Sequence, residues 1–416
     1  MGTLPSIAYI HESYSASMKV VFLSDDFPPS SFGGAGFSTY ELAKGVQKAG
    51  HEVLVVTTCR EASDAGEFAY EGLTVFRIAS DYHERWRAWL GLYNPPVVRQ
   101  VEKLLRRLQP DVVHANNTHY YLSYHCLTVA KRHAKTVVWT ARDTMSISYG
   151  KLDTPRYLET LDTRLSWFDN LREARLRYNP LRNYLIRRYL RSADVRLAVS
   201  SALKDALERN GIQPVETLHT GMEATAWQAS PEALAAFRSK FGLEGKQVIL
   251  FGGRLSAGKG QGQALEAARL VRELIPESVL LIMGGSEQKE DTGIAQTGWI
   301  TGEEKKAAYA ASDIVWVPSV YLDPLPRMAL EAQASGKPVI ATKFGGAPEL
   351  VQDGETGYVV NPLYAQEIAD KTIDLLQHPE RAVAMGHSGR ARIQSDFNLN
   401  KKVAELIALY GALVRK

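Results

Sequence analysis

The sequence has few cysteines: its 416 residues include two, Cys59 and Cys126, and neither belongs to a C-x-x-C pair. This usage argues against a disulfide framework and a structural zinc site, and it fits a reducing cytosol. No apolar run approaches the roughly 18 residues needed to cross a bilayer. Residues 1–17 lack the charged and apolar regions of a secretion signal, so they are either an accessory strand or a segment upstream of the native start. We therefore expect a cytoplasmic protein.

An excess of charge of one sign is also missing. The chain has 49 Lys and Arg against 46 Asp and Glu, a net charge of +3, which does not favour nucleic acid as a partner. Its composition of 45% hydrophobic and 23% charged residues excludes collagen-like, low-complexity and disordered classes. At about 150 residues per domain, the length predicts two or three domains.

Short apolar segments alternate with helical patterns along the whole chain, which predicts parallel sheets covered by helices on both faces. One helix is expected over 37–49. The predicted strands form two series: 19–24, 52–58, 111–114, 136–140 and 195–200, then 247–251, 279–283, 314–318, 338–341 and 357–360. Two series indicate two Rossmann-like, doubly wound domains, 1–220 and 221–399. A final helix within 400–416 has one apolar face, and we expect it to return to the first domain.

Gly34-Ala-Gly36 resembles the start of a dinucleotide-binding fingerprint but does not match it. Eight residues separate Gly33 from the preceding strand, and Thr39 stands at the position of the third glycine. We therefore reject a nicotinamide or flavin site. Instead, we expect Gly33 and Gly34 to lie in a loop over the cleft between the domains, with backbone N–H groups that can approach an anion.

A second segment, Gly253-Arg-Leu-Ser-Ala-Gly-Lys259, follows a strand and precedes a helix, as a phosphate-binding P-loop does. However, Gly260 stands where that motif needs a Ser or Thr hydroxyl for magnesium, so we reject an NTPase. Arg254 and Lys259 still place two cations beside the positive end of a helix that starts near Gln261. The alternative is a pair of solvated loop cations.

Two carboxylates, Asp323 and Glu331, are eight residues apart. Pro324 and Pro326 suit the start of a helix, and a strand precedes the segment. Both carboxylates are therefore expected at the carboxyl end of a sheet, where α/β proteins bind ligands. The alternative is that they are ordinary surface charges.

Five motifs of the second half occur in a characteristic order. They are Phe251-Gly-Gly-Arg-Leu-Ser-Ala-Gly-Lys-Gly260, Gly298-Trp-Ile300, Asp323-Pro-Leu-Pro-Arg-Met-Ala-Leu-Glu-Ala332, Gly336-Lys-Pro-Val-Ile340 and Gly345-Gly-Ala-Pro-Glu349. Together they look like the donor-binding half of the family-4 glycosyltransferases, which are retaining enzymes with the GT-B fold. Four upstream segments fit as well: Gly33-Gly34, Asp111-Val-Val-His114, Ala198-Val-Ser-Ser-Ala202 and Thr220-Gly-Met-Glu223. The resemblance covers about residues 18 to 415.

The resemblance implies a role for each matched position. Glu331 would bind the nucleotide ribose, and the backbone of Ile300 would contact the base. After the glycine pair that ends at Gly253, Arg254 and Lys259 would neutralise the donor diphosphate. Asp323, at the first carboxylate of the motif, would be a catalytic residue. Backbone groups of the following residues would contact the donor sugar: Leu325, Pro326, Arg327 and Met328.

The chain departs from the family at three places. Asp323 replaces a glutamate, and Leu325-Pro326 replaces a Phe-Gly pair, which removes one N–H donor. Arg142 stands where the family often has a histidine facing the sugar. A guanidinium only donates hydrogen bonds and stays charged, so we expect an acceptor or an anion opposite Arg142. The alternative is a structural pair of Arg142 with Asp143.

The implied activity is metal-independent hexosyl transfer, with no other cofactor. The donor would be a UDP-sugar first and a GDP-sugar second, and the acceptor a glycan, a lipid-linked sugar or a small molecule. A non-catalytic sugar-nucleotide-binding subunit and a nucleoside-diphosphate-sugar epimerase of the same fold are the alternatives.

Finally, residues 164–191 contain eight arginines mixed with aromatic residues. This pattern predicts either a solvated helical face or a surface for an anionic membrane or an acceptor. The second reading would place the protein peripherally on the cytoplasmic face of a membrane.

Overall fold

The computed structural model describes residues 16–31, 33–252 and 256–415, which form two compact units. The first unit contains the described residues up to Leu152, together with Asp162–Thr220 and the C-terminal segment from Leu399. The second unit contains Asp153–Leu161 and Gly221–Asn398. The short segment Asp153–Leu161 therefore belongs to the second unit although the first unit flanks it in the sequence. Gly253, Arg254 and most of the predicted N-terminal accessory segment lie outside the described residues.

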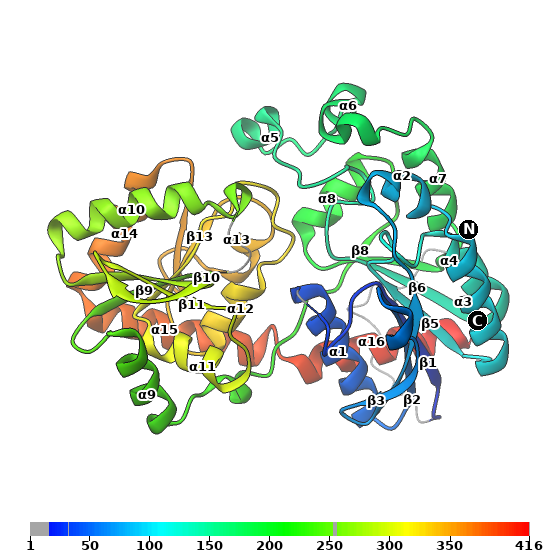
Figure 1. Cartoon of the computed structure of the whole chain (residues 1–416), viewed down its shortest axis with the longest axis horizontal. Helices are drawn as coiled ribbons and strands as arrows, with labels where there is room; N and C mark the ends of the chain where they lie inside the picture. Colours follow the sequence, from blue (N-terminus) through cyan, green and yellow to red (C-terminus); the bar gives the residue numbers. More distant parts are fainter. Residues whose placement is uncertain (1–15, 32, 253–255, 416) are drawn as a thin grey trace. The chain divides into compact units, whose positions relative to one another are not determined.

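The sheet of the first unit is built around β1 (Lys19–Ser24), which is parallel to β2 (Glu52–Cys59) on one side and to β5 (Val112–Asn116) on the other. The strand order is β3-β4-β2-β1-β5-β6-β7-β8 (Figure 1). The remaining strands are β3 (Gly66–Tyr70), β4 (Leu73–Ala79), β6 (Thr136–Ala141), β7 (Val195–Ala198) and β8 (Glu216–Thr217). All described pairs are parallel except β3 with β4, which form an antiparallel edge.

Helices of the first unit connect and cover these strands (Figure 1). They are α1 (Gly34–Lys48), α2 (Arg87–Leu90), α3 (Pro95–Leu108), α4 (His125–His133), α6 (Trp167–Ala174), α7 (Arg182–Leu190), α8 (Ser201–Arg209) and α16 (Leu399–Val414). Within the described ranges, no helix combines the length and the apolar character required to span a bilayer.

The second unit has a six-stranded sheet in the order β11-β10-β9-β12-β13-β14. Its strands are β9 (Gln247–Gly252), β10 (Ser278–Asp291), β11 (Ile294–Gly298), β12 (Ile314–Val317), β13 (Val339–Thr342) and β14 (Gly357–Val360). Its helices are α5 (Pro155–Thr160), α9 (Pro231–Phe241), α10 (Gln261–Leu274), α11 (Gly302–Ala311), α12 (Arg327–Ala334), α13 (Ala347–Leu350), α14 (Ala365–Gln377) and α15 (Pro379–Ser395).

The central strands β9, β12 and β13 are largely apolar because both of their faces are buried. In β9, Val248 and Leu250 belong to one apolar cluster, whereas Ile249 and Phe251 belong to another. Successive strand residues point to opposite faces of a sheet, so the two clusters lie on its two sides. The predicted doubly wound α/β class is confirmed.

Each predicted strand is present near its predicted position, but three details were wrong. Strand β10 extends to Asp291, well beyond the predicted 279–283, and the sequence did not predict β3, β4, β8 or β11. Helix α1 begins at Gly34 rather than at residue 37, since Gly33 is the N-cap with extended backbone. Gly34 and Gly36 therefore lie in the first turn of a helix instead of a loop.

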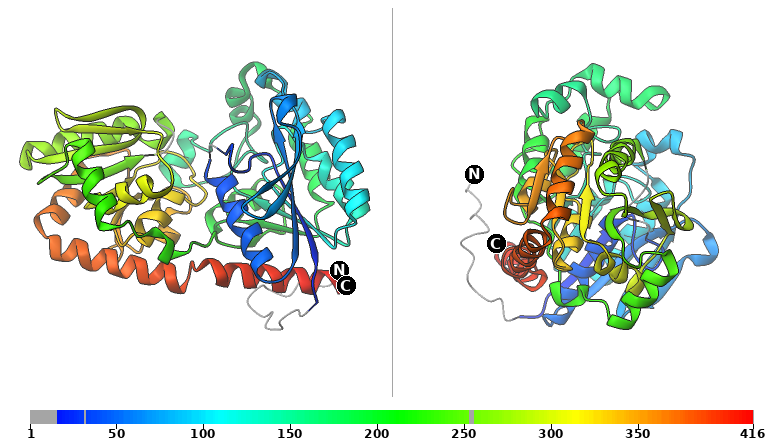
Figure 2. Two further views of the ribbon diagram at one scale, coloured as in Figure 1. Left: turned by 60° about the horizontal axis from the view of Figure 1, so that its bottom comes forward. Right: turned by 90° about the vertical axis from the view of Figure 1, so that its left-hand side faces the viewer.

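Helix α16 returns to the first unit, as predicted. It packs beside α1, where the two helices can be followed in Figure 2. Its apolar face, including Val403, Leu406 and Tyr410, joins the cluster that contains the side chains of β1 and β2. A side chain at Gly45 of α1 would overlap Val403, so a glycine is needed for this close helix packing.

Polar bonds fix α16 to the sheet as well. The ring of His114, on β5, lies 2.6 Å through Nδ1 from the Tyr410 hydroxyl and 2.7 Å through Nε2 from Thr140 Oγ1. His114 is fully buried, and burial together with the nearby charge of Arg142 lowers its pKa to about 3. A neutral imidazole with both nitrogens bonded therefore links the C-terminal helix to strands β5 and β6.

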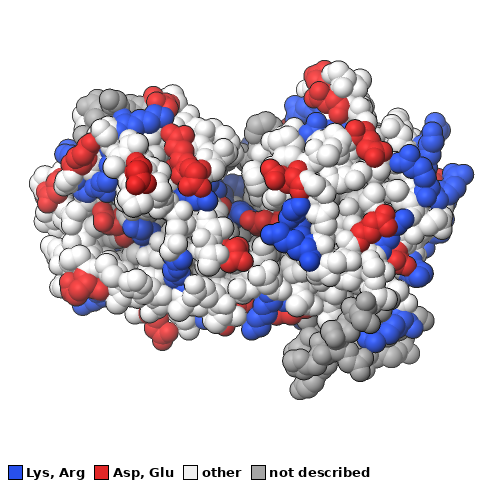
Figure 3. Space-filling model, turned by 90° about the horizontal axis from the view of Figure 1, so that it is seen from below, with Lys and Arg blue, Asp and Glu red and all other residues white. Residues whose placement is uncertain are grey.

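The molecular surface carries charges of both signs. On the face shown in Figure 3, lysine and arginine side chains are interspersed with aspartate and glutamate. This mixture agrees with the small net charge of +3. A surface of this kind on that face does not favour a nucleic acid partner.

Replacing Tyr410 by Phe should destabilise the first unit, because it leaves the buried His114 Nδ1 without its partner. The expected loss is about 1–3 kcal/mol in the free energy of unfolding. Chemical denaturation followed by tryptophan fluorescence measures it, with Tyr184→Phe as the control because the Tyr184 side chain is 57% exposed. Unfolding midpoints that are equal for both variants would show that the His114–Tyr410 bond does not stabilise the unit.

Candidate active site

Two predicted site residues, Lys259 and Asp323, meet at the carboxyl ends of β9 and β12. Lys259 Nζ lies 2.6 Å from Asp323 Oδ2, and the Ser319 hydroxyl donates to the same oxygen at 2.9 Å. Asp323 is buried, whereas the Lys259 side chain keeps 28% of its surface exposed. The lysine is therefore held by a buried carboxylate at one end of the sheet and still reaches the surface.

The two groups hold each other in the charged state. Burial alone would raise the pKa of Asp323, but the Lys259 ammonium and the Ser319 hydroxyl outweigh it, and the pKa lies below its usual range. Burial likewise opposes the charge of Lys259, but Asp323 and Tyr321 raise the pKa of the lysine above its ordinary value. An ammonium has three N–H donors, and with Asp323 and Tyr321 as partners it keeps one for a ligand.

A glycine turn packs directly on Asp323. The Gly346 N–H donates to the Asp323 backbone oxygen at 2.8 Å. Gly345 has φ +74, and a side chain there would overlap the Asp323 backbone. The Gly345 N–H donates to the Tyr157 hydroxyl at 2.8 Å. Tyr157, in α5, is thus a site residue that the sequence did not reveal, because no recognised motif surrounds it.

Glu331 lies in the second turn of α12 and is 2% exposed. Its Oε1 accepts from Lys305 Nζ at 2.7 Å and from Arg327 Nε at 2.9 Å, while Oε2 accepts from the Tyr309 hydroxyl at 2.7 Å. Burial would raise the pKa of Glu331, but Lys305 and Arg327 hold it below its usual range. A carboxylate has about four acceptor positions, so three donors leave one for a ligand hydroxyl.

The residues between the two carboxylates form the start of α12. Pro326 is the N-cap, with φ −66, and the helix begins at Arg327. The Arg327 side chain is directed at Glu331, and Leu325 and Met328 pack against the core of the unit. Arg327 and Met328 occupy the first turn of α12, where backbone N–H groups of a helix lack intrahelical acceptors.

The loop before α10 explains why the segment matches the P-loop motif only in part. Gly260 is the N-cap of α10 and has φ +79. A side chain at this position would overlap the Pro318 backbone oxygen. A Ser or Thr therefore cannot replace Gly260 without moving the strand end, and the structure agrees with the rejection of an NTPase site.

Ile300 lies between β11 and α11 and is buried at 7% exposure, whereas the preceding Trp299 is 57% exposed. In the first unit, Gly33 and Gly34 begin α1, and a side chain at Gly36 would overlap Ser31.

Arg142 follows β6 at the carboxyl edge of the first sheet. Its Nε donates to Asn116 Oδ1 at 2.9 Å, and one terminal nitrogen donates to Thr220 Oγ1 at 3.3 Å. Asp143 contacts His119 at 3.5 Å and accepts from the Met145 N–H at 2.9 Å. Both of these hydrogen bonds of Arg142 go to neutral acceptors at a sheet edge, and these contacts of Asp143 are with other residues.

The arginine-rich segment 164–191 divides into two parts. Trp167 and Phe168, in α6, are 56% and 72% exposed, as a surface segment would be. Arg182, at the start of α7, is only 7% exposed, so the prediction of a solvated face is wrong for this residue. Contact of the exposed part with a membrane stays a prediction.

Two family models match consecutive parts of the chain. Residues 32–225 match the model for Glycosyltransferase Family 4, and residues 235–392 match the model for Glycosyl transferases group 1.

Individual relatives show the same likeness. Over 193 residues the chain is 35% identical to the GDP-mannose-dependent alpha-(1-6)-phosphatidylinositol monomannoside mannosyltransferase of Mycolicibacterium smegmatis, a match that covers 42% of this chain and half (50%) of the relative's length. Glycogen synthase of Mycobacterium tuberculosis is 24% identical over 428 residues, which cover 96% of this chain and 95% of that protein.

Solved structures share the fold over nearly the whole chain. Sucrose-phosphate synthase from Thermosynechococcus elongatus aligns with a TM-score of 0.74 at 21% identity, covering 95% of this chain and 98% of that one. HepE of Anabaena, in complex with UDP-glucose, aligns with a TM-score of 0.68 at 20% identity, covering 94% and 100%. With both of its halves matched by family models and its architecture shared with these structures, the chain belongs to the family-4 glycosyltransferases and has their GT-B fold.

Proposed function

We propose that this glycosyltransferase moves a hexose from a nucleoside-diphosphate sugar to an acceptor hydroxyl, with retention at the anomeric carbon and without a metal ion. The observation that carries the proposal is the buried Asp323–Lys259 pair, which lies at the carboxyl end of the same sheet as Glu331. Under this proposal, the cation for the diphosphate and the acceptor for the ribose belong to one unit. The acceptor is a glycan, a lipid-linked sugar or a small molecule.

The chemistry requires stabilisation of the leaving group. When the bond between the anomeric carbon and the β-phosphate oxygen breaks, negative charge develops on the phosphate. Lys259 would meet this charge with its remaining N–H, and Asp323 keeps the ammonium oriented. The acceptor oxygen bonds to the anomeric carbon on the face that the phosphate leaves, and its proton passes to the departing phosphate. No protein nucleophile is required.

Two other functions would use the same nucleotide site. A non-catalytic binding subunit would bind the sugar nucleotide without turnover, and an epimerase would release a free, epimerised sugar. Incubation with the donor and analysis of the products separates all three functions.

The choice of nucleotide is tested first by thermal shift with UDP, GDP, ADP and dTDP. A ligand at 100 times its dissociation constant stabilises the fold by about 2.7 kcal/mol. We expect UDP to give the largest shift, followed by GDP. The similar proteins include a GDP-mannose-dependent enzyme and a structure in complex with UDP-glucose, so both nucleotides belong in the panel.

The ribose role of Glu331 predicts selectivity for ribonucleotides that depends on this residue. The wild type should bind the preferred diphosphate at least tenfold more tightly than its 2′-deoxy form, because the deoxy form lacks a hydroxyl for the carboxylate. Glu331→Gln should lose most of this ratio. Calorimetry with both nucleotides on both proteins measures it, and the ratio is insensitive to a general loss of stability. An unchanged ratio in the variant would remove Glu331 from the ribose site.

If Lys259 neutralises the leaving group, Lys259→Ala should lower the rate of transfer about 10²–10³-fold. Transfer by the wild type should persist in EDTA. Lys246→Ala is not expected to change the rate, because Lys246 precedes β9 at the amino end of that strand, opposite the end that Lys259 follows. If EDTA abolishes transfer and magnesium or manganese restores it, a metal ion rather than Lys259 stabilises the leaving group.

Arg142 is proposed to act on the substrate from the first unit. Arg142→Ala should lower transfer at least tenfold with little change in nucleotide affinity, because Lys259 and Glu331 belong to the second unit. Arg142→His should recover little of the rate, whereas added guanidinium should restore part of it in the alanine variant. A variant that melts at a lower temperature but keeps the wild-type rate would show that Arg142 only bridges Asn116 and Thr220.

A further inference from the structure

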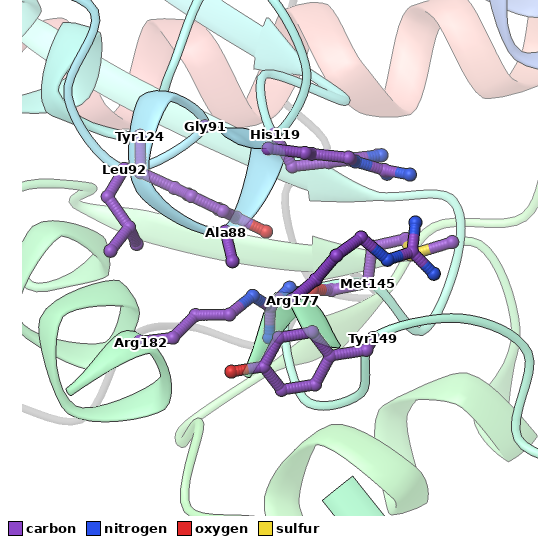
Figure 4. Close-up of a pocket in the computed structure, with 10 residues that line it drawn as sticks. Ala88, Gly91, Leu92, His119, Tyr124, Met145, Tyr149, Arg177 and Arg182 are labelled. Atoms are coloured by element: carbon purple, nitrogen blue, oxygen red, sulfur yellow. The ribbon is translucent and has the colours of Figure 1, made fainter. Parts of the chain in front are cut away.

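The first unit contains a pocket lined by three arginines, Arg87, Arg177 and Arg182. Figure 4 shows Arg177, Arg182 and Tyr149 around the same space as Tyr124 and His119. The lining residues of this pocket include no aspartate and no glutamate. They come from four separate stretches of the chain, so the pocket exists only in the folded unit.

Arg182 is a buried cation whose described hydrogen bonds go to neutral groups. Its guanidinium donates to Asn183 Oδ1 at 2.7 Å and to the Met145 backbone oxygen, and it lies 4.6 Å from the centre of the Tyr149 ring. Burial lowers the pKa of Arg182, and the charge of Arg87 acts in the same direction. A charge taken out of water without a carboxylate partner is costly, and an anion in the pocket would offset that cost.

Arg87 and Tyr124 both present unused donors. Within the described part of the chain, the Arg87 guanidinium makes no hydrogen bond or ion pair, and it lies 4.2 Å from the Tyr120 ring centre. Tyr124 is 2% exposed, and its hydroxyl has no described hydrogen-bond partner. In Figure 4 this hydroxyl points into the pocket. A buried hydroxyl and a cation that lack partners are the donors that a bound oxyanion requires.

Two carboxylates near the pocket have their close contacts with groups other than the three arginines. Asp143 contacts His119 at 3.5 Å, and Asp25 accepts from the Tyr120 and Leu122 N–H groups at 2.6 and 2.7 Å. Burial raises the pKa of Asp25 to about 7, so it is only partly charged near neutrality.

Two more carboxylates act on the arginines of the pocket. Glu84 lies 4.0 Å from Arg177, and their side chains are 67% and 35% exposed, a geometry that contributes little binding. Glu173 raises the pKa of Arg182 only as the weakest of several influences. Inside the pocket, positive charge therefore exceeds negative charge.

We infer that this pocket binds a phosphate group carried by the sugar acceptor. A phosphate has the charge and the several acceptor oxygens to engage two guanidinium groups and the Tyr124 hydroxyl at once, as arginine forks do with phosphates. The inference rests on the proposed function, because it names the acceptor class of that same transfer. The phosphate belongs either to a soluble sugar phosphate or to the head group of a phosphorylated lipid.

The test measures the affinity of the full-length protein for inorganic phosphate by calorimetry. Arg87→Gln should weaken binding at least tenfold, and because Arg87 makes no hydrogen bond in the free protein, the variant should keep its fold. Arg99→Gln is the matched control, since it removes the same charge from an exposed position on α3. Tyr124→Phe should weaken binding as well. Wild-type affinity in Arg87→Gln, or no phosphate binding by the wild type, overturns the inference.

Transfer assays then identify the source of the phosphate. Hexose phosphates and vesicles containing a phosphoinositide are offered as acceptors, with glucose and glucuronate for comparison. In Arg87→Gln, KM for the phosphorylated acceptor should rise at least tenfold, while nucleotide affinity and transfer to an uncharged acceptor stay unchanged. Efficient transfer to glucose alone would refute the phosphate site and leave the proposed function standing. If the wild type bound none of the nucleoside diphosphates, the proposed function itself would be refuted.

Discussion

Burial of both faces of each sheet is the constraint on which the rest of the structure depends. A strand whose side chains enter apolar clusters on both sides, as in β9, cannot present a polar group to a ligand from its middle. Polar chemistry is therefore confined to the loops at the strand ends. Asp323 follows β12, Lys259 follows β9, and Arg142 follows β6, each at the carboxyl end of its strand. The fold thus decides where the site lies, and the loop sequences decide what it binds.

Buried charge makes those loops rigid. Asp323 and Glu331 are both nearly inaccessible to water, and each is stable as a carboxylate only because neighbouring cations compensate its charge. Glu331, in α12, ties that helix to α11 through Lys305 and Tyr309, and Arg327 of the same helix supplies a second cation. Orientation of Lys259 is likewise complete before any ligand arrives, so little reorganisation is needed when charge develops on a leaving phosphate. The same compensation explains why removal of one partner would affect both binding and stability.

The sequence predicted most of the second unit and less of the first. Its strands, the start of α10 near Gln261 and the position of Glu331 inside a helix followed from apolar runs, glycines and prolines, which act locally. The hairpin of β3 and β4 was missed because β3 is largely exposed and has no apolar run. Tyr157 was missed because its contact with Gly345 joins residues 188 positions apart, and no local pattern records such a contact. The start of α1 was misjudged because glycines at 34 and 36 disfavour helix unless packing, here against Ser31, requires them.

The two units differ in how their charged side chains are compensated. This difference helps to explain why the second unit is easier to recognise from the sequence. In the second unit, Lys259 and Asp323 neutralise each other although 64 positions separate them, and each lies in a short motif that can be read from the sequence. In the first unit, the arginines of the pocket come from residues 87, 177 and 182 and have no carboxylate beside them in the lining. The arginine-rich segment 164–191 indicated part of this pocket, but its residues differ in solvent exposure. Phe168 is exposed, whereas Arg182 is buried. Composition alone cannot distinguish a solvated cation from a buried one. Only the folded arrangement shows that Arg182 is buried without a carboxylate beside it, which is why an acceptor-binding pocket can be inferred from the structure and not from the sequence.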